Sequence, residues 1–219
     1  MPNDPSSWRL YVIVDRDAVG ARDPAEVTAA AVRGGADAIQ LRDKRSPDAD
    51  VARAAQRLLA ITRAAGVPLI INDRLEVACA VGADGLHLGQ DDLPLAAARR
   101  RLGPGPLLGR STHSLEQALA AQEQGADYLG VGPIFATPTK PDSPSVGVEL
   151  IRGVAARVRA PLVCIGGIDR STVASVLAAG ARCVAVVRAV CAAQDPEAAA
   201  RALKRQLAQF HRTTNASTL

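Results

Sequence analysis

Short apolar runs alternate with amphipathic stretches along the whole chain, and this alternation constrains the fold more than any other feature. The apolar runs have the length and composition of β-strands, and they are Leu10–Asp15, Ala38–Arg42, Leu69–Asp73, Gly85–Gly89, Leu107–Ser111, Tyr128–Gly132, Leu162–Gly167 and Cys183–Val187. The stretches between them carry apolar residues at helical spacing, and they are Pro24–Arg33, Asp48–Ala65, Leu75–Val81, Leu93–Leu102, Leu115–Gln124, Val148–Val158, Ser171–Ala179 and Pro196–Gln209. This strict alternation predicts parallel strands joined by crossover helices.

A repeated turn sequence marks the points where helices give way to strands. Gly-Ala-Asp occurs at residues 35–37, 82–84 and 125–127, and Gly180-Ala181-Arg182 takes the same place before the last strand. Glycine readily adopts the left-handed conformation that ends a helix. These turns therefore support the boundaries that the hydrophobic pattern predicts.

Eight strand–helix units within 219 residues favour an α/β fold of the closed (β/α)8 type, a TIM barrel. An open doubly wound sheet is the main alternative. Such a sheet normally has a glycine-rich turn after its first strand, whereas Asp15-Arg16-Asp17 stands there in this chain. No linker divides the sequence, so residues 1–219 are predicted as a single domain with mobile tails at about residues 1–7 and 211–219.

Composition narrows the classes of function. Hydrophobic residues make up 48% and charged residues 22%, as expected of a soluble globular protein. No apolar run approaches the roughly 20 residues that span a membrane, and the N-terminus lacks a basic-then-apolar signal segment, so we expect a cytoplasmic protein. Aromatic content of 2% argues against nucleic-acid binding by stacking, and a net charge of +4 suits a small anionic substrate. The sequence leaves the oligomeric state open, including a homo-oligomer.

The four cysteines are Cys79, Cys164, Cys183 and Cys191. None belongs to a C-x-x-C pair. We therefore predict small buried thiols rather than metal ligands or nucleophiles.

Polar residues gather where the predicted strands end, which is where a barrel enzyme builds its active site. The second strand ends in Gln40, Arg42 and, just beyond it, Lys44. Because side chains alternate along a strand, Gln40 and Arg42 share a face and point into the barrel mouth if Leu41 packs against the helices. An amide and two cations suit a polar ring that carries a polyphosphate, although solvated charges at a strand end are the plainer interpretation.

A stiff loop follows the sixth strand, in the segment Gly130–Asp142. It brings Thr137, Thr139 and Lys140 within four residues, between Pro138 and Pro141. Hydroxyls and an ammonium held in this way can bind a phosphate. Taken alone, the segment is equally consistent with a rigid surface turn.

Two carboxylates follow neighbouring strands at the same predicted edge. Asp73 and Asp92 have no cysteine or histidine cluster beside them, which suits a hard cation such as Mg²⁺. Each aspartate could instead cap a helix, and spacing alone does not separate Asp91 from Asp92 as the ligand. Gly166-Gly167 could present backbone N–H groups to a phosphate or simply form a tight turn.

The remaining polar residues fit no familiar catalytic group. His87 lies within a strand and is predicted as a core or supporting residue, whereas His113 is better placed but has no evident partner. The sequence shows no convincing Ser/His/Asp triad, Walker loop or zinc signature.

Six segments in order resemble the motifs of the thiamine phosphate synthase family across nearly the whole chain. They are Gln40–Lys44, Ile71–Arg74, Gly85–Asp92, Gly109–Ser114, Gly130–Asp142 and Ile165–Ile168. The resemblance implies a transferase that joins 4-amino-2-methyl-5-hydroxymethylpyrimidine diphosphate to 4-methyl-5-(2-phosphooxyethyl)thiazole, giving thiamine phosphate and diphosphate. The related thiazole tautomerase and a non-catalytic thiamine-phosphate-binding barrel are the alternatives.

The resemblance also implies roles for individual residues. Those that would hold the pyrimidine diphosphate are Gln40, Arg42, Lys44, Asn72, Ser111 and Lys140, of which Arg42, Ser111 and Lys140 would be catalytic. Asp73 and Asp92 would bind Mg²⁺. Those that would hold the thiazole phosphate are Thr137, Thr139, Gly167, Val187 and Arg188.

Two positions depart from the family pattern. Asp43 stands where the family usually has glutamate, a change that we expect to matter little. Arg188 stands where the family usually has serine. Its guanidinium could replace the lost hydroxyl contact with a charge-assisted hydrogen bond to phosphate, or turn away and leave only backbone donors.

Overall fold

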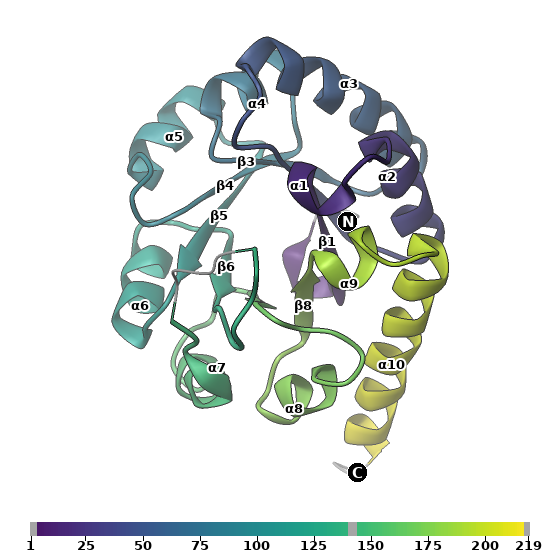
Figure 1. Cartoon of the computed structure of the whole chain (residues 1–219). Coiled ribbons are helices and arrows are strands. Elements are labelled where there is room, and N and C mark those ends of the chain that lie inside the picture. Colours follow the sequence, from purple (N-terminus) through teal and green to yellow (C-terminus); the bar gives the residue numbers. More distant parts are fainter. Residues whose placement is uncertain (1–3, 140–143, 217–219) are drawn as a thin grey trace.

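The computed structural model of the protein describes residues 4–139 and 144–216. Its strands are all parallel and form a closed barrel in sequence order, as the alternation predicts. The strands are β1 (Leu10–Asp15), β2 (Ala38–Arg42), β3 (Leu69–Asn72), β4 (Gly85–Leu88), β5 (Leu107–Thr112), β6 (Tyr128–Val131), β7 (Leu162–Ile165) and β8 (Cys183–Val186). Figure 1 shows this barrel within a ring of helices.

The ring contains every helix that the hydrophobic pattern predicts, and three shorter helical segments lie outside the ring. The helices are η1 (Pro5–Ser7, a 3-10 helix), α1 (Arg16–Val19), α2 (Pro24–Arg33), α3 (Asp48–Ala64), α4 (Leu75–Val81), α5 (Leu95–Leu102), α6 (Leu115–Glu123), α7 (Gly147–Ala155), α8 (Val173–Ala178), α9 (Arg188–Cys191) and α10 (Pro196–Ala216). The sequence pattern missed η1, α1 and α9 because segments of three or four residues are too short to show a helical period.

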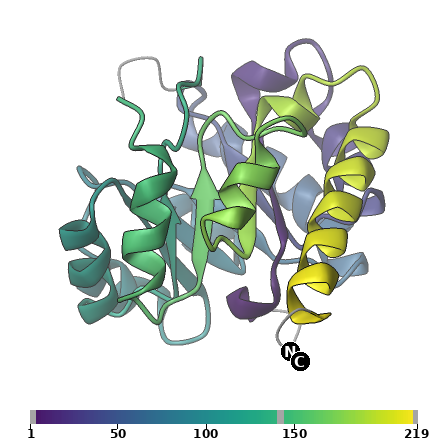
Figure 2. The ribbon, with the colours of Figure 1, turned by 90° about the horizontal axis from the view of Figure 1, so that it is seen from below.

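Both predicted tails contain ordered structure. Pro5 is buried in η1, where the Asp4 side chain accepts a hydrogen bond from the Ser6 backbone N–H at 2.9 Å. Helix α10 continues to Ala216, past its predicted end at Gln209. In Figure 2, α10 (yellow) lies along the outside of the barrel.

Close packing between α10 and α2 completes the helical ring. A Cβ atom on Gly34 would lie only 2.5 Å from the Ala200 Cβ, so glycine is required at this contact. Arg33 and Glu197 add an ion pair at 2.7 Å across the same interface. None of the described helices combines the length and apolar character needed to cross a membrane.

The repeated aspartates join neighbouring strands at the N-terminal end of the barrel. The Asp37 carboxylate accepts hydrogen bonds from the backbone N–H groups of Arg9 and Leu10, each at 2.8 Å. Asp84 accepts in the same way from the N–H of Leu69 at the start of β3 (2.8 Å), and Asp127 accepts from that of Leu108, the second residue of β5 (2.7 Å). Each Gly-Ala-Asp turn therefore satisfies backbone donors that a strand start would otherwise leave unpaired.

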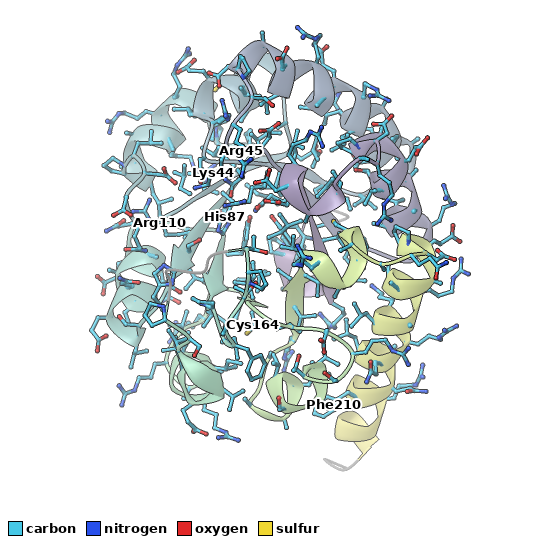
Figure 3. The ribbon with its side chains drawn as sticks, viewed as in Figure 1. Lys44, Arg45, His87, Arg110, Cys164 and Phe210 are labelled. Atoms are coloured by element: carbon cyan, nitrogen blue, oxygen red, sulfur yellow. The ribbon has the colours of Figure 1, made fainter. Side chains whose placement is uncertain are left out.

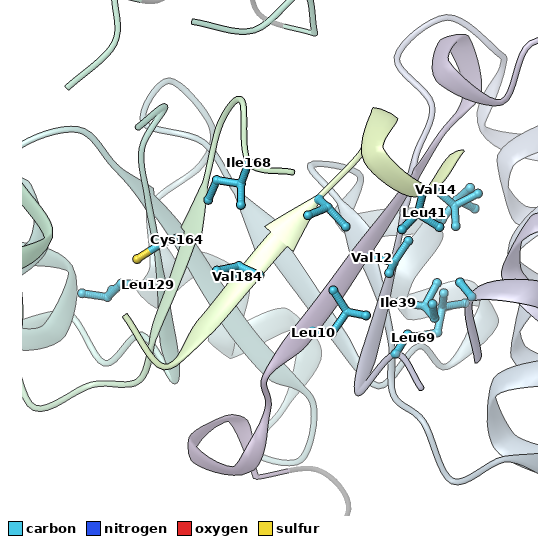
Figure 4. Packing of buried hydrophobic residues seen from close by; sticks show 14 of the residues in the cluster. Leu10, Val12, Val14, Ile39, Leu41, Leu69, Leu129, Cys164, Ile168 and Val184 are labelled. Carbon is cyan, nitrogen blue, oxygen red and sulfur yellow. The ribbon is translucent and has the colours of Figure 1, made fainter. Parts of the chain in front are cut away.

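Side chains leave each strand in two opposite directions and build two cores. Those that point outward pack against the helices, as Leu10, Val12 and Leu41 do (Figure 4). Those that point inward fill the lower barrel around Trp8, which is 1% exposed, and Tyr11. The inner core closes the N-terminal end of the barrel, so the opposite end is left for a cavity.

Candidate active site

A cavity of about 540 Å³ opens at the C-terminal ends of the strands. Of the residues predicted to bind substrates, those that line it are Gln40, Arg42, Asn72, Ser111, Thr137, Thr139, Gly167, Val187 and Arg188. Lys44, Asp73 and Asp92 belong to the loops after β2, β3 and β4. Lys140 lies outside the described residues.

The end of β2 delivers its polar side chains to this cavity. Leu41 packs in the outer core, so Gln40 and Arg42 point inward, as alternation requires. Arg42 forms an ion pair with Asp15, which is 3% exposed. The Asp15 carboxylate also accepts hydrogen bonds from the backbone N–H groups of Asp17 (3.1 Å) and Ala18 (3.0 Å). Sequence reasoning missed Asp15, which fixes the position of the Arg42 guanidinium.

Two carboxylates face each other beside the cavity. Asp73 adopts a left-handed conformation (φ 62°) within a tight turn that is closed by a 2.7 Å hydrogen bond from the Arg74 N–H to the Asn72 carbonyl. Lys44 lies 3.0 Å from Asp73, as an ion pair. Burial and a hydrogen bond shared with Asp73 raise the pKa of Asp92, while Lys44 opposes this shift. The strained turn at Asp73 thus places like charges together, a cost that suits a functional site.

Hydrogen bonds from Gly89 and Arg110 hold the loop that carries Asp92. The Asp92 carboxylate accepts a 2.6 Å hydrogen bond from the Gly89 N–H. Arg110, labelled in Figure 3, is buried and donates to the carbonyls of Gln90 (3.1 Å) and Leu93 (3.2 Å). Asp91 is exposed, whereas Asp92 is half-buried and shares a hydrogen bond with Asp73.

The loop after β6 rests on the glycine pair after β7. The backbone N–H of Ile134 donates to the Ile165 carbonyl at 2.8 Å, and that of Phe135 donates to the Gly166 carbonyl at 3.0 Å. A Cβ atom on Gly166 would lie 2.5 Å from Pro133, and one on Gly167 would lie 2.7 Å from the Phe135 Cβ. The glycines thus permit the approach that brings Thr137 and Thr139 to the cavity wall.

The end of β8 lines the cavity next to β7. Val187 precedes the four-residue helix α9, and its carbonyl accepts hydrogen bonds from the N–H groups of Val190 (3.1 Å) and Cys191 (2.8 Å). Arg188 is exposed at the cavity edge. Arg188 therefore lines the same cavity as Thr137, Thr139 and Gly167 of the β6 and β7 loops.

A buried chain of hydrogen bonds runs beneath the cavity floor. The Gln40 Nε2 donates to the Tyr11 hydroxyl at 2.9 Å, and the hydroxyls of Tyr11 and Tyr128 are 3.1 Å apart. His87 Nδ1 lies 3.0 Å from the Tyr128 hydroxyl, and its Nε2 lies 2.9 Å from the Ser111 Oγ. This chain of hydrogen bonds joins Gln40 and Ser111, both of which are predicted to bind substrate. The three residues between them, Tyr11, Tyr128 and His87, were given no role in binding by the sequence. Strand alternation places Tyr11 on β1 and Tyr128 on β6 inside the barrel, and this was the sequence signal that could have indicated buried hydrogen-bond partners.

The second histidine also has a structural partner. His113 lines the cavity, and its Nδ1 forms a hydrogen bond with the Gly132 carbonyl. Sequence reasoning found no partner for it because the contact comes from the neighbouring strand end. His113 therefore links the end of β5 to the start of the β6 loop.

The cysteines lie apart from this chemistry. Cys164, Cys183 and Cys191 are buried and Cys79 is partly exposed, all as free thiols. Burial raises the pKa of Cys164 to about 12. Among the described residues, no group of three or more histidine, cysteine, aspartate and glutamate side chains could hold a metal ion, so the Asp73–Asp92 pair is the acidic feature to consider.

Together these features define a (β/α)8 barrel whose mouth gathers cationic, amide and hydroxyl side chains in one cavity. The family model described as thiamine monophosphate synthase matches residues 10–190, so the chain belongs to this family and is a transferase. It is 51% identical over 195 residues to a thiamine-phosphate synthase of Roseiflexus sp. (strain RS-1), covering 89% of this chain and 83% of that protein. It is 50% identical over 198 residues to that of Chloroflexus aurantiacus, covering 90% and 91%.

A solved structure shows the same arrangement. The thiamine phosphate pyrophosphorylase from Pyrococcus furiosus superposes with a TM-score of 0.87 at 36% identity, covering 94% of this chain and 98% of that one. The likeness therefore extends over the barrel as a whole.

Proposed function

We propose that the chain condenses 4-amino-2-methyl-5-hydroxymethylpyrimidine diphosphate with 4-methyl-5-(2-phosphooxyethyl)thiazole, and that the products are thiamine phosphate and diphosphate. The observation that carries the proposal is the convergence of amide, hydroxyl and cationic side chains on one cavity, with paired carboxylates at its edge. The relatives named above are synthases, which favours this reaction over the tautomerase-like alternative.

The cavity has two sides with different chemistry. Gln40, Arg42, Asn72 and Ser111 come from β2, β3 and β5, and we assign the pyrimidine diphosphate to them. The hydroxyls and backbone of the β6, β7 and β8 loops face them, and we assign the thiazole phosphate to that side. A volume of about 540 Å³ lies within the range of pockets that bind small molecules.

Charge stabilisation explains the chemistry without a side-chain nucleophile. An electron-rich aminopyrimidine can support a methylene cation, so its bond to diphosphate can break before the thiazole nitrogen attacks. The protein must then stabilise the charge on the leaving diphosphate, and a preorganised electrostatic contribution of this kind is often the largest in catalysis. Arg42 is preorganised by Asp15, and Lys44, two residues further along, is paired with Asp73 at the edge of the cavity. Holding both rings in one cavity lowers the entropic cost of their encounter.

The paired carboxylates fit a hard divalent cation. Burial and then the neighbouring Asp73 carboxylate raise the pKa of Asp92, and a cation between the two carboxylates would relieve their repulsion. Asp73 and Asp92 would hold Mg²⁺, with Lys44 as the neighbouring positive charge. When bound, Mg²⁺ supplies charge neutralisation to the leaving diphosphate.

The direct test combines the purified protein with both substrates and Mg²⁺ and measures thiamine phosphate and diphosphate together. We expect the two products in equal amounts, and none when either substrate is omitted. Addition of EDTA should abolish the reaction, and excess Mg²⁺ should restore it. A lack of thiamine phosphate at high enzyme concentration would refute the proposed reaction. Full activity in EDTA would refute only the proposed requirement for Mg²⁺.

A further inference from the structure

The hydrogen-bonded chain beneath the cavity has a direction, and this direction decides what the protein offers to a bound ring. The five side chains in order are Gln40, Tyr11, Tyr128, His87 and Ser111, and the links between them measure 2.9, 3.1, 3.0 and 2.9 Å. Gln40 and Ser111 line the cavity, whereas the two tyrosines are 1% exposed. We refer to these five residues as the relay.

Counting protons assigns one direction to the relay. Gln40 Nε2 donates to Tyr11, which leaves three links for the protons of Tyr11, Tyr128 and the imidazole of His87. Burial raises the pKa of both phenols, so each keeps its proton. Every link then receives one proton only if Tyr11 donates to Tyr128 and Tyr128 donates to His87 Nδ1. His87 is consequently protonated at Nε2, from which it donates to Ser111.

The alternatives leave a buried polar atom unsatisfied. An imidazolium would bring four protons to three links, so one phenolic proton would lack an acceptor within the relay. Protonation at Nδ1 with Gln40 still donating would leave two donors facing each other at one link. Unpaired buried donors cost about 1–3 kcal/mol each, so the relay reverses only as a whole.

The packing of β5 and β6 shows that the contact between Tyr128 and His87 is built into the barrel. A Cβ atom on Gly109 would lie 2.2 Å from the Tyr128 Cζ and 2.4 Å from His87 Nδ1. One on Gly130 would lie 3.1 Å from His87 Cε1. Glycine on both strands leaves the space that these two rings occupy inside the barrel, where Figure 3 places His87.

The ends of the relay present a defined pattern to the cavity. With its Nε2 directed to Tyr11, Gln40 keeps its Oε1 as an acceptor for a ligand. Because Ser111 accepts from His87, its own hydroxyl proton is available as a donor. An acceptor at one end of the relay and a donor at the other, both lining one cavity, complement a ring that carries an amino group and an unprotonated ring nitrogen. A 4-oxo ring with an N–H beside its carbonyl presents the opposite pattern, and its carbonyl oxygen would meet the Gln40 Oε1, two acceptors together, unless the amide and the relay reverse.

We propose that the relay is a specificity device, in which Tyr11, Tyr128 and His87 act as positioning residues that select a 4-aminopyrimidine over a 4-oxopyrimidine. This inference rests on the proposed function, because it concerns the ring of the diphosphate substrate. A site built from buried polar groups rejects a ring of the wrong pattern more strongly than an apolar pocket does, because the mismatch leaves those groups unpaired.

The first test reads the direction of the relay without any substrate. Nitrogen-15 NMR of the histidines distinguishes the two tautomers, and the signals of His87 are identified by their loss in His87→Gln. We expect His87 to be protonated at Nε2 and unprotonated at Nδ1. A neutral ring protonated at Nδ1, or an imidazolium at pH 7.5 (roughly one unit above the ordinary histidine pKa), would overturn the inference. This outcome is independent of whether the protein is active.

The second test measures selectivity. The dissociation constants of the 4-amino and 4-oxo pyrimidine diphosphates are measured by calorimetry without the thiazole phosphate, for the wild-type protein and for Tyr128→Phe. We expect the wild-type protein to prefer the amino ring by roughly 100-fold and Tyr128→Phe by roughly tenfold or less. Each protein is judged by the ratio of its two dissociation constants, so a loss of affinity that is common to both pyrimidine diphosphates cancels.

A matched control separates selectivity from stability. Thr112 follows Ser111 on β5, is buried, and donates to the Gly130 carbonyl at 2.9 Å on the side facing away from the relay. Thr112→Val removes a buried hydroxyl of comparable environment and should leave the preference within about twofold of the wild-type value. An unchanged preference for the amino ring in Tyr128→Phe would refute the role of the relay in selectivity. Failure of the wild-type protein to bind either diphosphate or to form product would instead count against the proposed function.

Discussion

Replacing Gly167 by alanine tests the packing that holds the β6 loop against the cavity. Gly167 has a φ of 61°, and an added Cβ would lie 2.7 Å from the Phe135 Cβ and 2.8 Å from the Ala136 carbonyl oxygen. Gly66 is the matched control, because it has a φ of 67° and nothing within 4 Å of an added Cβ. The two substitutions therefore share the backbone strain and differ in the close contact.

The expected losses follow from these two contributions. Alanine in the left-handed region costs about 1–2 kcal/mol, which is the whole effect that we expect for Gly66→Ala. Displacing packed atoms adds about 1–3 kcal/mol, so Gly167→Ala should lose about 2–5 kcal/mol. In a protein of this size, each kcal/mol lowers Tm by about 2–4 °C.

Urea denaturation provides the measurement. Trp8 is the single tryptophan and lies buried in the inner core, so its fluorescence reports unfolding of the barrel itself. The free energy of unfolding of each variant is compared with that of the wild-type protein. Equal losses for Gly167→Ala and Gly66→Ala would show that the β6 loop does not pack on the glycine turn, and would refute the reasoning.

Three further predictions concern the site and its surroundings. Asp92→Ala should lower kcat/KM roughly 100-fold more than Asp91→Ala, because only Asp92 shares a hydrogen bond with the Asp73 carboxylate; the reverse order in a product assay would identify Asp91 as the ligand. Arg188→Ala should raise KM for the thiazole phosphate alone, and unchanged steady-state kinetics would mean that the side chain points away. Cys79 should be the one thiol that reacts rapidly with a disulfide reagent at pH 8 in the native protein, with all four reacting in urea; fast reaction of further native thiols would contradict the burial that raises the pKa of Cys164 to about 12.

Most of the fold follows from local sequence patterns. The limits of β1 and β2 match the predicted runs, and those of the other strands differ by a residue or two. Such agreement is expected where apolar periodicity and glycine turns indicate the same boundary. The short helices α1 and α9 escaped prediction because four residues are too few to show a helical period.

Only part of the candidate site could be predicted from the sequence. Residues such as Gln40 and Arg42 could be assigned from strand alternation and from the family resemblance, because both depend on position along the chain. The partners that orient them could not be assigned, since Asp15 and Tyr11 lie 27 and 29 residues from their contacts. A strand sequence shows which face a side chain occupies but not which neighbour it meets across the barrel.

By itself, then, the sequence determined the alternation of strands and helices, the end of the barrel that carries polar residues, and the types of group gathered there. Only the tertiary structure decided that Asp92 rather than Asp91 faces Asp73, that Asp15 holds Arg42, and that Tyr11, Tyr128 and His87 connect Gln40 to Ser111. The physical reason is that periodicity is a local property of the chain. Hydrogen-bond partners inside a closed barrel depend instead on the register and radius of all eight strands.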